Sequence, residues 1–585
     1  MVCKILPKIQ SPTRRPVTNE TQEGMPEVAD YETALDIAGY GRFSRSALGA
    51  CAFAFFASGV QNCVMSYVLP AARCELDLTT YQAGLINMAF MSGGVASAFF
   101  WGIVGDVFGR RNVLSMTLLL DATITLAQST VADNRLLLAA RTINGFVIGG
   151  PATLVFSYLS DLVGARKRQL YLSVVGMSFV VAWLILPAVA WLVIPFKVAN
   201  YETLLPISSW RLFLALASIP GFISGGWVLY LPESPRLLSD TNRSDKALKL
   251  LAYIHKANNG TSAEYKIKKL IQDDVFVAKT MGGAGEDSRT KVLFMSVIKD
   301  LKTFVSKSYA VKSSLILFMF FANMAAGFGL NMWIPELLLR IQGRECKLTA
   351  STAAPENARL FNASTPWKDL KFDSYGKEIP IAGLNDTSFD DHFGQSSTCN
   401  SHIDQEVFTS GLIVGACCVL GNAACAILCA RGGALGVRRA AIACTAVCAL
   451  ASACLAATAC SCSSFNRIAV AAAAALNAAS LNGNVLLIRL LLHALPAKLS
   501  GLGVCWGAWW GRAGGVASNL AVGALLDFSC PAPFIAVGAL LALSIGAIMV
   551  IKLGDDTEES PKREEGPENG QEKNTGLDRY ISTYM

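Results

Sequence analysis

The most sharply spaced charged residues of this chain lie in one seven-residue stretch, Gly105-Asp106-Val107-Phe108-Gly109-Arg110-Arg111. Asp106 can accept hydrogen bonds from guanidinium groups, and the two glycines permit a tight turn and a close approach of two helices. The chemistry that this stretch offers is the making and breaking of ion pairs. We find no nucleophile–base pair, metal-ligand cluster or phosphate-binding loop, so we expect no catalytic residue, no metal and no cofactor.

Further charged residues stand at the ends of other apolar segments, as in the run Pro232-Glu233-Ser234-Pro235-Arg236. An exposed ion pair contributes about 0–1 kcal/mol, but several together can shift a two-state equilibrium by a few kcal/mol, which is enough for a gate. The predicted gate residues are Gly105, Asp106, Gly109, Arg110, Arg111, Arg141, Asp161, Arg168, Glu233 and Arg236.

The composition shows which elements must position these residues. Of 585 residues, 53% are hydrophobic and 16% are charged, and the mean hydropathy is +0.43. A soluble domain is typically about 25% charged. Apolar blocks of about 20 residues recur, each long enough to cross a bilayer as a helix. This pattern excludes a soluble enzyme, a disordered protein and a small disulfide scaffold. The net charge of +7 is scattered over short loops, so we expect no nucleic-acid partner.

The apolar blocks predict twelve spanning helices, six on each side of a central polar loop at 232–312. They give an N-terminal tail at 1–45, a first half at 46–231, a second half at 313–551 with a large loop at 340–405, and a disordered tail at 552–585. The predicted helices are 46–69, 81–104, 113–129, 136–159, 170–194, 212–231, 313–336, 407–429, 440–460, 468–492, 499–526 and 532–551. Within the central loop, helical spacing predicts one further helix over 245–257.

Short loops rich in arginine predict which side of the membrane each loop occupies. Arg110, Arg111 and Arg166–Arg168 put these loops, the central loop and both termini in the cytoplasm. The 340–405 loop then lies outside, where Asn362 and Asn385 begin glycosylation sequons. A topological role alone would explain the arginines of the 105–111 stretch, but neither its aspartate nor both of its glycines.

Two groups of cysteines stand out among the seventeen. Nine lie between Cys417 and Cys462 in alanine-rich sequence, where we expect them to act as small apolar packing residues. Cys346 and Cys399 share the predicted outer loop and are candidates for a disulfide. Cys74 and Cys530 are alternative outer partners.

Polar residues inside spanning helices usually face a cavity or a partner. Amides donate and accept hydrogen bonds, which suits a neutral hydroxylated or zwitterionic solute. An interhelical hydrogen bond is the competing explanation for each asparagine. The candidate cavity residues are Gln61, Asn62, Asn144, Asn323, Asn331, Trp333, Asn484 and Arg489.

The 105–111 stretch, placed between two spanning helices, resembles the loop signature of the major facilitator superfamily. A weaker copy, 432–439, follows the eighth helix, as two related halves would leave. The runs 39–43, 156–161, 209–211 and 333–336 resemble the synaptic-vesicle glycoprotein 2 family and its relatives. The resemblance implies an all-α membrane protein of twelve transmembrane helices in two pseudo-symmetric six-helix halves, the major facilitator fold.

The chain departs from that family in ways that mark a divergent member. The first helix reads Ala57-Ser58-Gly59-Val60-Gln61-Asn62, without the acidic residues that family members carry there. We expect a monomeric transporter of a small organic solute, a sugar or an organic ion, in the plasma membrane or a vesicle membrane. The alternative is a non-transporting membrane glycoprotein that binds partners or acts in vesicle traffic.

Overall fold

The computed structural model is almost entirely helical. It describes residues 28–97, 100–195, 208–240, 243–260, 265–271, 306, 310–342, 405–429, 434–461, 466–495 and 497–551. Asn362, Asn385, Cys346, Cys399 and the tail at 552–585 lie outside these residues. Cys74 and Cys530, the two alternative outer cysteines, are each disulfide-bonded.

The first six predicted spans correspond to eight described helices. These are α2 (Arg42–Cys63), α3 (Met65–Ala72), α4 (Thr80–Ser97), α5 (Phe100–Phe108), α6 (Arg110–Gln128), α7 (Asn134–Leu162), α8 (Ala165–Val193) and α9 (Ser209–Tyr230). Local sequence sets several of these ends. Asp133 precedes α7, and its side chain accepts a hydrogen bond from the backbone of Arg135. Gly109 precedes α6 with φ of 100°, a backbone conformation that favours glycine.

The last six predicted spans are also helical. They are α14 (Ala310–Met324) continued by the π-helix η1 (Ala325–Leu330), the 3₁₀ turn η2 (Asn331–Trp333) and α15 (Ile334–Gln342), then α17 (Gln405–Cys429), α18 (Ala434–Ser461), α19 (Asn466–Ala494), α20 (Ala497–Phe528) and α21 (Ala532–Val550). Within the described ranges, nine helices are long and apolar enough to span a membrane, and the pair α4 and α5, which meet at 50°, makes ten. α6 and α20 complete the twelve as long but less apolar helices, and the twelve-helix prediction is confirmed.

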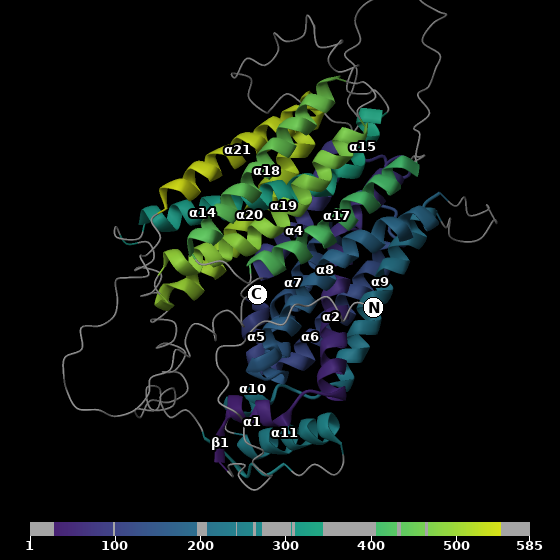
Figure 1. The fold of residues 1–585 in the computed structure, drawn as a ribbon. Coiled ribbons are helices and arrows are strands. Elements are labelled where there is room, and N and C mark those ends of the chain that lie inside the picture. The colour runs from purple at the N-terminus through teal and green to yellow at the C-terminus, as the bar shows by residue number, and fades with distance from the viewer. Residues whose placement is uncertain are drawn as a thin grey trace, which may run out of the picture.

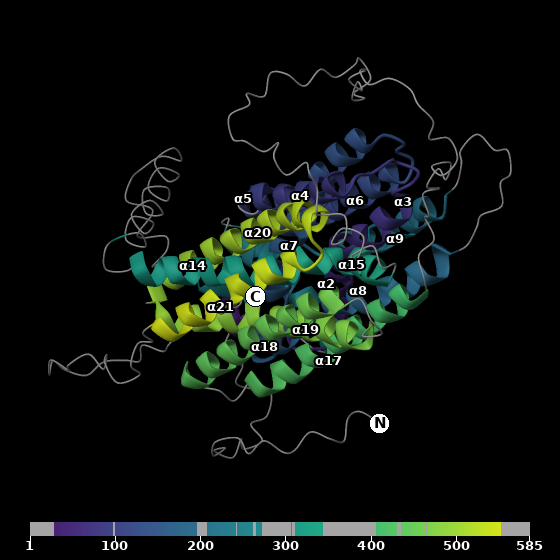
Figure 2. The same ribbon diagram turned by 90° about the horizontal axis from the view of Figure 1, so that it is seen from above.

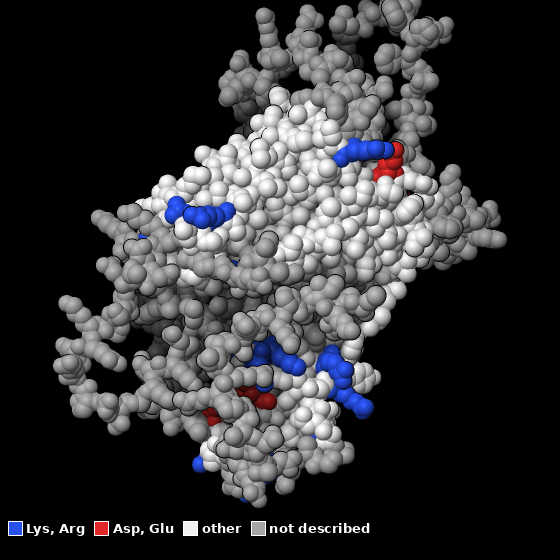
Figure 3. Space-filling model, viewed as in Figure 1, with Lys and Arg blue, Asp and Glu red and all other residues white. Residues whose placement is uncertain are grey.

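The two halves meet along two helix pairs. α4 packs against α20, and α8 packs against α17 (Figures 1 and 2). We call the end of the molecule with α15 the α15 side. The opposite end of the first half, with α11 (Ser244–Asn259), is the α11 side. In Figure 1 the helices of the two halves converge toward α15 and diverge away from it. Figure 3 shows a broad uncharged surface over this bundle, with charged side chains gathered near its ends, as a lipid-facing surface requires.

The apolar cores follow the same arrangement. One core combines residues of both halves, among them Tyr67 and Leu186 with Val407 and Phe408. A second core holds residues of the first half with Ile254 of α11, and a third holds residues of the second half only. The second core lies toward the α11 side, where the first half therefore packs on its own.

A small layer covers the α11 side of the first half. It consists of β1 (Val28–Asp30), α1 (Tyr31–Ala38), α10 (Pro235–Asp240), α11 (Ser244–Asn259) and β2 (Lys269–Ile271). The strands pair in parallel, with Val28 opposite Lys269. The 245–257 helix is confirmed as α11. Within the stretch predicted as a tail at 1–45, the described residues from 28 onward form β1, α1 and the start of α2, and apolar Ala34 and Leu35 of α1 pack with Leu251 of α11.

Candidate functional site

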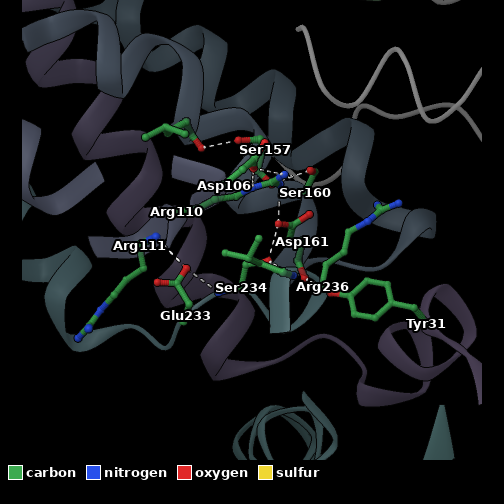
Figure 4. Close-up of polar contacts among 12 residues, drawn as sticks. Tyr31, Asp106, Arg110, Arg111, Ser157, Ser160, Asp161, Glu233, Ser234 and Arg236 are labelled. Atoms are coloured by element: carbon green, nitrogen blue, oxygen red, sulfur yellow. Dashed lines mark hydrogen bonds and ion pairs between the residues drawn. The ribbon is translucent and has the colours of Figure 1, made fainter. Parts of the chain in front are cut away.

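Arg110 is the centre of the charged cluster on the α11 side (Figure 4). Its Nε and Nη2 donate to Oδ1 of Asp106, four residues earlier on α5, at 3.1 and 2.9 Å. Its Nη1 donates to Oδ2 of Asp161 at 2.7 Å, at the end of α7. Asp161 has only 1% of its side chain exposed, whereas Asp106 has 60%. The Arg110–Asp161 pair is therefore the stronger of the two, because water screens it less.

Asp161 also binds two residues that are not among the predicted gate residues. Ser234 Oγ donates to Oδ2 of Asp161 at 2.5 Å, and Tyr31 Oη donates to its backbone oxygen at 2.7 Å. Burial first, and then the nearby Asp161 carboxylate, raise the pKa of Tyr31 well above its ordinary value. Tyr31 therefore stays protonated and remains a donor across the physiological range.

Glu233 holds the start of α6. Its Oε1 accepts hydrogen bonds from the backbone nitrogens of Arg111 at 2.9 Å and of Ser234 at 3.0 Å. A carboxylate at a helix N-terminus also interacts favourably with the helix dipole. Glu233 packs directly against Gly109, and a Cβ there would collide with its carboxylate. Gly109 thus meets two requirements, the positive φ and the room for Glu233.

Glu32 of α1 joins two of the predicted gate residues. Its carboxylate accepts from Arg168 Nη2 at 2.6 Å and from Arg236 Nη1 at 3.5 Å. The described ion pairs of the predicted gate residues therefore connect helix ends of the first half with α1. Glu32 could not be predicted as a member of the cluster, because it lies more than 130 residues from Arg168 and no local spacing relates them.

Arg141, which is also among the predicted gate residues, lies elsewhere on α7. It is 20 residues before Asp161 on the same helix, or about 30 Å along the axis. Its Nη1 donates to Asn144 Oδ1 at 2.6 Å, and its Nη2 donates to the Gln61 backbone oxygen at 3.0 Å. Asn144 Nδ2 in turn donates to Asp121 Oδ1 at 2.6 Å. A buried polar network thus links α2, α6 and α7.

The candidate cavity residues fall into three places. Gln61 and Asn144 belong to the buried network just described, and Asn62 donates to the Ser58 backbone oxygen on its own helix. Asn323 donates to Asn484 Oδ1 at 2.8 Å, which ties α14 to α19, and half-buried Arg489 follows on α19.

Asn331 and Trp333 line two neighbouring pockets between the halves. Cys63, Trp183 and Gly415 line the larger pocket with Asn331, and Asn87 lines the smaller with Trp333. The Nε1 atoms of Trp183 and Trp333 are buried without a partner in the described structure. The walls of these pockets are mainly apolar, and Asn87 and Asn331 add polar side chains to them.

An ion pair that sequence analysis missed borders the smaller pocket. Arg73 Nη1 lies 3.0 Å from Glu336 Oε1, which also accepts from Arg340 Nε at 3.0 Å. Arg340 Nη2 reaches Thr80 Oγ1 of the other half at 2.7 Å. Toward the middle of the molecule, Arg512 Nη1 donates to the Gly94 oxygen at 2.8 Å, which also joins the halves. The halves are therefore joined by polar contacts on the α15 side.

Comparison with known proteins agrees with this architecture. The chain is 29% identical over 342 residues to synaptic vesicle glycoprotein 2B of Mus musculus, which covers 56% of this chain and 50% of that protein. It is 30% identical over 330 residues to the Homo sapiens protein, covering 54% and 48%. The chain thus spans about half the length of the curated relatives it matches.

Solved structures of the same fold extend over most of the chain. The inward open xylose transporter XylE from E. coli aligns with a TM-score of 0.58 and 13% identity over 88% of this chain and 98% of that one. Its partially occluded inward open form aligns with a TM-score of 0.57, over 87% and 99%. The family model described as Major Facilitator Superfamily matches residues 50–355, more than half of the sequence. The chain belongs to the Major Facilitator Superfamily, with a resemblance to the synaptic vesicle glycoprotein 2 proteins.

Proposed function

We propose that this protein carries a small organic solute across a membrane by alternating access. The observation that supports this most directly is the division of the apolar core. The halves share one core with residues of both, whereas two further cores belong to one half each. Two halves that contact each other along one interface can rotate about this interface, which we call the seam. Such a rotation exposes a central site to each side of the membrane in turn.

We propose that the α11 side faces the cytoplasm, with both termini there. Arg110, Arg111 and Arg166–Arg168 support this orientation through the positive-inside rule. The described conformation is then closed to the outside by the Arg73–Glu336 pair and separated on the inside. The inward open form of XylE, which has the same fold, agrees with that state.

The solute that we propose is a small organic molecule. It is either a neutral or zwitterionic compound, such as a sugar, or an organic ion. The paired pockets support this, because the amides of Asn87 and Asn331 lie among apolar walls. We propose that the protein acts as a monomer in the plasma membrane or a vesicle membrane. The name of its synaptic vesicle relatives supports the vesicle membrane.

The test is uptake of radiolabelled sugars, organic cations and organic anions into proteoliposomes. The informative variant is Asp161→Asn, which removes the buried partner of Arg110. The matched control is Asp245→Asn, an exposed aspartate of α11 on the same side. We expect saturable uptake of one class, reduced at least about fivefold by Asp161→Asn, a shift of roughly 1 kcal/mol in the conformational equilibrium, and unchanged by the control.

The alternative is a membrane glycoprotein that binds partners without transport. No uptake of any class at several pH values, by protein shown to be folded, would support it and contradict our proposal. Equal uptake by the parent and Asp161→Asn would contradict the gate role of Asp161 while leaving transport in place.

A further inference from the structure

The buried network of Asp121, Asn144 and Arg141 contains an ionisable carboxyl that the gate and the pockets do not use. All three side chains lie inside the first half, with exposed fractions of 1%, 0% and 1%. Asp121 is on α6, 11 residues after Arg110, and so about 16 Å from the α11-side cluster along the helix. Ionisable groups at such a depth are costly and usually mark an ion or proton pathway.

The carboxyl and the guanidinium do not touch directly. Asn144 stands between them, accepting from Arg141 through Oδ1 and donating to Asp121 Oδ1 through Nδ2. Asp121 Oδ2 and Arg141 Nε are buried and, among the described residues, lack a hydrogen-bond partner. An ionised Asp121 balances the charge of Arg141 but leaves Oδ2 unsatisfied, whereas a proton on Oδ2 removes the negative charge.

Few other charges surround Asp121. α6 packs mainly against α5, α7 and α9. Of the titratable residues on those helices, Asp106 and Asp161 lie at the α11 side, Arg135 and Arg211 near the opposite helix ends, and Tyr158 and Tyr230 toward the α11 side. Arg141 is the charged side chain that shares the network with Asp121, so the protonation of Asp121 changes the charge balance of Arg141 first.

Arg141 carries that change to the seam between the halves. Its guanidinium lies 4.1 Å from the centre of the Phe90 ring on α4, and its Nη2 holds the Gln61 oxygen on α2. One turn beyond Phe90, the Gly94 oxygen accepts from Arg512 of the second half. A single helix, α4, therefore contacts both the network and α20.

We propose that Asp121 is a proton-binding site that couples the rocking of the halves to a proton. The inference rests on the proposed transport function for its role, though not for proton binding itself. In the binding step Oδ2 takes up one proton from water, and the carboxylate becomes a neutral carboxylic acid. Arg141 then loses its counter-charge, and its contacts with Gln61 on α2 and Phe90 on α4 change.

Infrared difference spectroscopy of the full chain tests proton binding without any substrate. On acidification we expect a C=O band of a protonated carboxylic acid that exchanges slowly in heavy water, and we expect Asp121→Asn to remove it. Asp245→Asn, which changes an exposed aspartate, should leave the band in place. A band that persists in Asp121→Asn, or its absence in the parent at every pH, would overturn the proposal.

A second variant covers the case in which Asp121→Asn does not fold. Asn144→Ser shortens the bridge and withdraws the 2.6 Å donor from Asp121. Loss of a donor to the charged form strengthens proton binding, by about tenfold for one such bond. The midpoint of the band should therefore move up by about one pH unit, and an unchanged midpoint would count against the site.

Transport separates this inference from the proposed function. If the parent takes up a solute, an inward proton gradient should accelerate uptake in the parent but not in Asp121→Asn, while uptake at equal pH persists in both. If the proton gradient does not change the rate of uptake in the parent, the proposed coupling is overturned. No uptake at all would contradict the transporter proposal, and the infrared band would still decide whether Asp121 binds a proton.

Discussion

At the scale of single residues, Gly109 shows how one backbone position sets the charged cluster. Its φ of 100° and the adjacent Glu233 carboxylate leave no place for a Cβ. We expect Gly109→Ala to destabilise the protein by about 1–3 kcal/mol, because strain and a collision act together. The thermal unfolding midpoint of purified protein measures this.

The matched control is Gly102→Ala on α5. A Cβ at Gly102 would meet nothing within 4 Å. Alanine is a better helix former than glycine, so this variant should be neutral or more stable by about 0.5–1 kcal/mol. An equal loss in both variants would show that Gly109 has no special role.

Glu75 supplies a pH-dependent contact outside the spans. It accepts from Trp210 Nε1 at 2.6 Å and from Arg211 Nη2 at 2.8 Å. Burial by itself would raise the pKa of Glu75, but hydrogen bonds from Ser208, Trp210 and Arg211 outweigh it and lower the pKa below its ordinary value. The stabilisation is therefore complete above the unfolded pKa of about 4.3 and is lost as pH falls through the folded value.

We expect Glu75→Gln to lower the unfolding midpoint by a constant amount above about pH 5, and the difference from the parent should shrink below that. Because the contact is partly exposed, its size should stay under about 1 kcal/mol. If the difference in unfolding midpoint between the parent and Glu75→Gln grows as the pH falls, the pKa of Glu75 is raised and not lowered, and the prediction is refuted.

The residues that could be predicted from sequence are those with local spacing. Asp106 and Arg110 are four apart and do pair, whereas Asp161, 51 residues from Arg110, is predicted from its place at a helix end. Tyr31, Glu32 and Ser234 could not be found in this way. Their partners lie 73 to 136 residues away, and only the folded chain brings them together.

At the scale of elements, the ion pairs of Glu32 attach α1 to the first half. Glu32→Gln removes the charge that Arg168 and Arg236 share and leaves two cations close together. We expect hydrogen exchange in β1 and α1 to quicken about tenfold, equivalent to roughly 1.4 kcal/mol, since charge-assisted hydrogen bonds are the stronger kind.

Asp30→Asn is the control, because Asp30 is an exposed acid in the adjoining strand. Its exchange rates should match those of the parent. If both variants exchange alike, the apolar contacts of Ala34 and Leu35 rather than the ion pairs hold α1 in place.

The seventh span shows what hydropathy cannot predict at this scale. Its apolar pattern predicts one continuous helix, and the structure has a π-helix at Ala325–Leu330 followed by a 3₁₀ turn. Ser480 Oγ and Ser518 Oγ donate to the oxygens of Asn323 and Ala325. These hydroxyls come from α19 and α20, so the break depends on tertiary contacts that the span's own sequence does not contain.

At the scale of the whole molecule, Glu336 holds the halves together on the α15 side. Glu336→Gln weakens its bonds to Arg73 and Arg340. We expect this side to open more often, by about three- to tenfold, since loss of roughly 1 kcal/mol shifts a two-state equilibrium by that factor.

Two buried thiols on one helix report the change. Cys63 lies in the core that both halves share, and Cys51 lies in the core of the first half. In Glu336→Gln, modification of Cys63 by a small thiol reagent, followed by mass spectrometry, should quicken while that of Cys51 does not. Equal acceleration at both would indicate general loosening instead of opening at the seam.

The twelve-helix plan could be predicted because most spans are apolar blocks of bilayer length. The seam could not, because it depends on which faces of separate helices meet. Arg73, Glu336 and Arg512 have no mutual spacing in the sequence, yet they join the halves. The candidate cavity residues were dispersed over three places for the same reason.

The parallel pairing of β1 with β2 has a consequence for biosynthesis. Val28 leaves the ribosome early and pairs with Lys269. The strands lie about 240 residues apart, and at roughly 5–20 residues per second the first waits about 12–48 s for the second. All six helices of the first half are synthesised in that interval. The α11 side of the first half therefore closes only after its helices have been made, and a nascent chain remains open there until then.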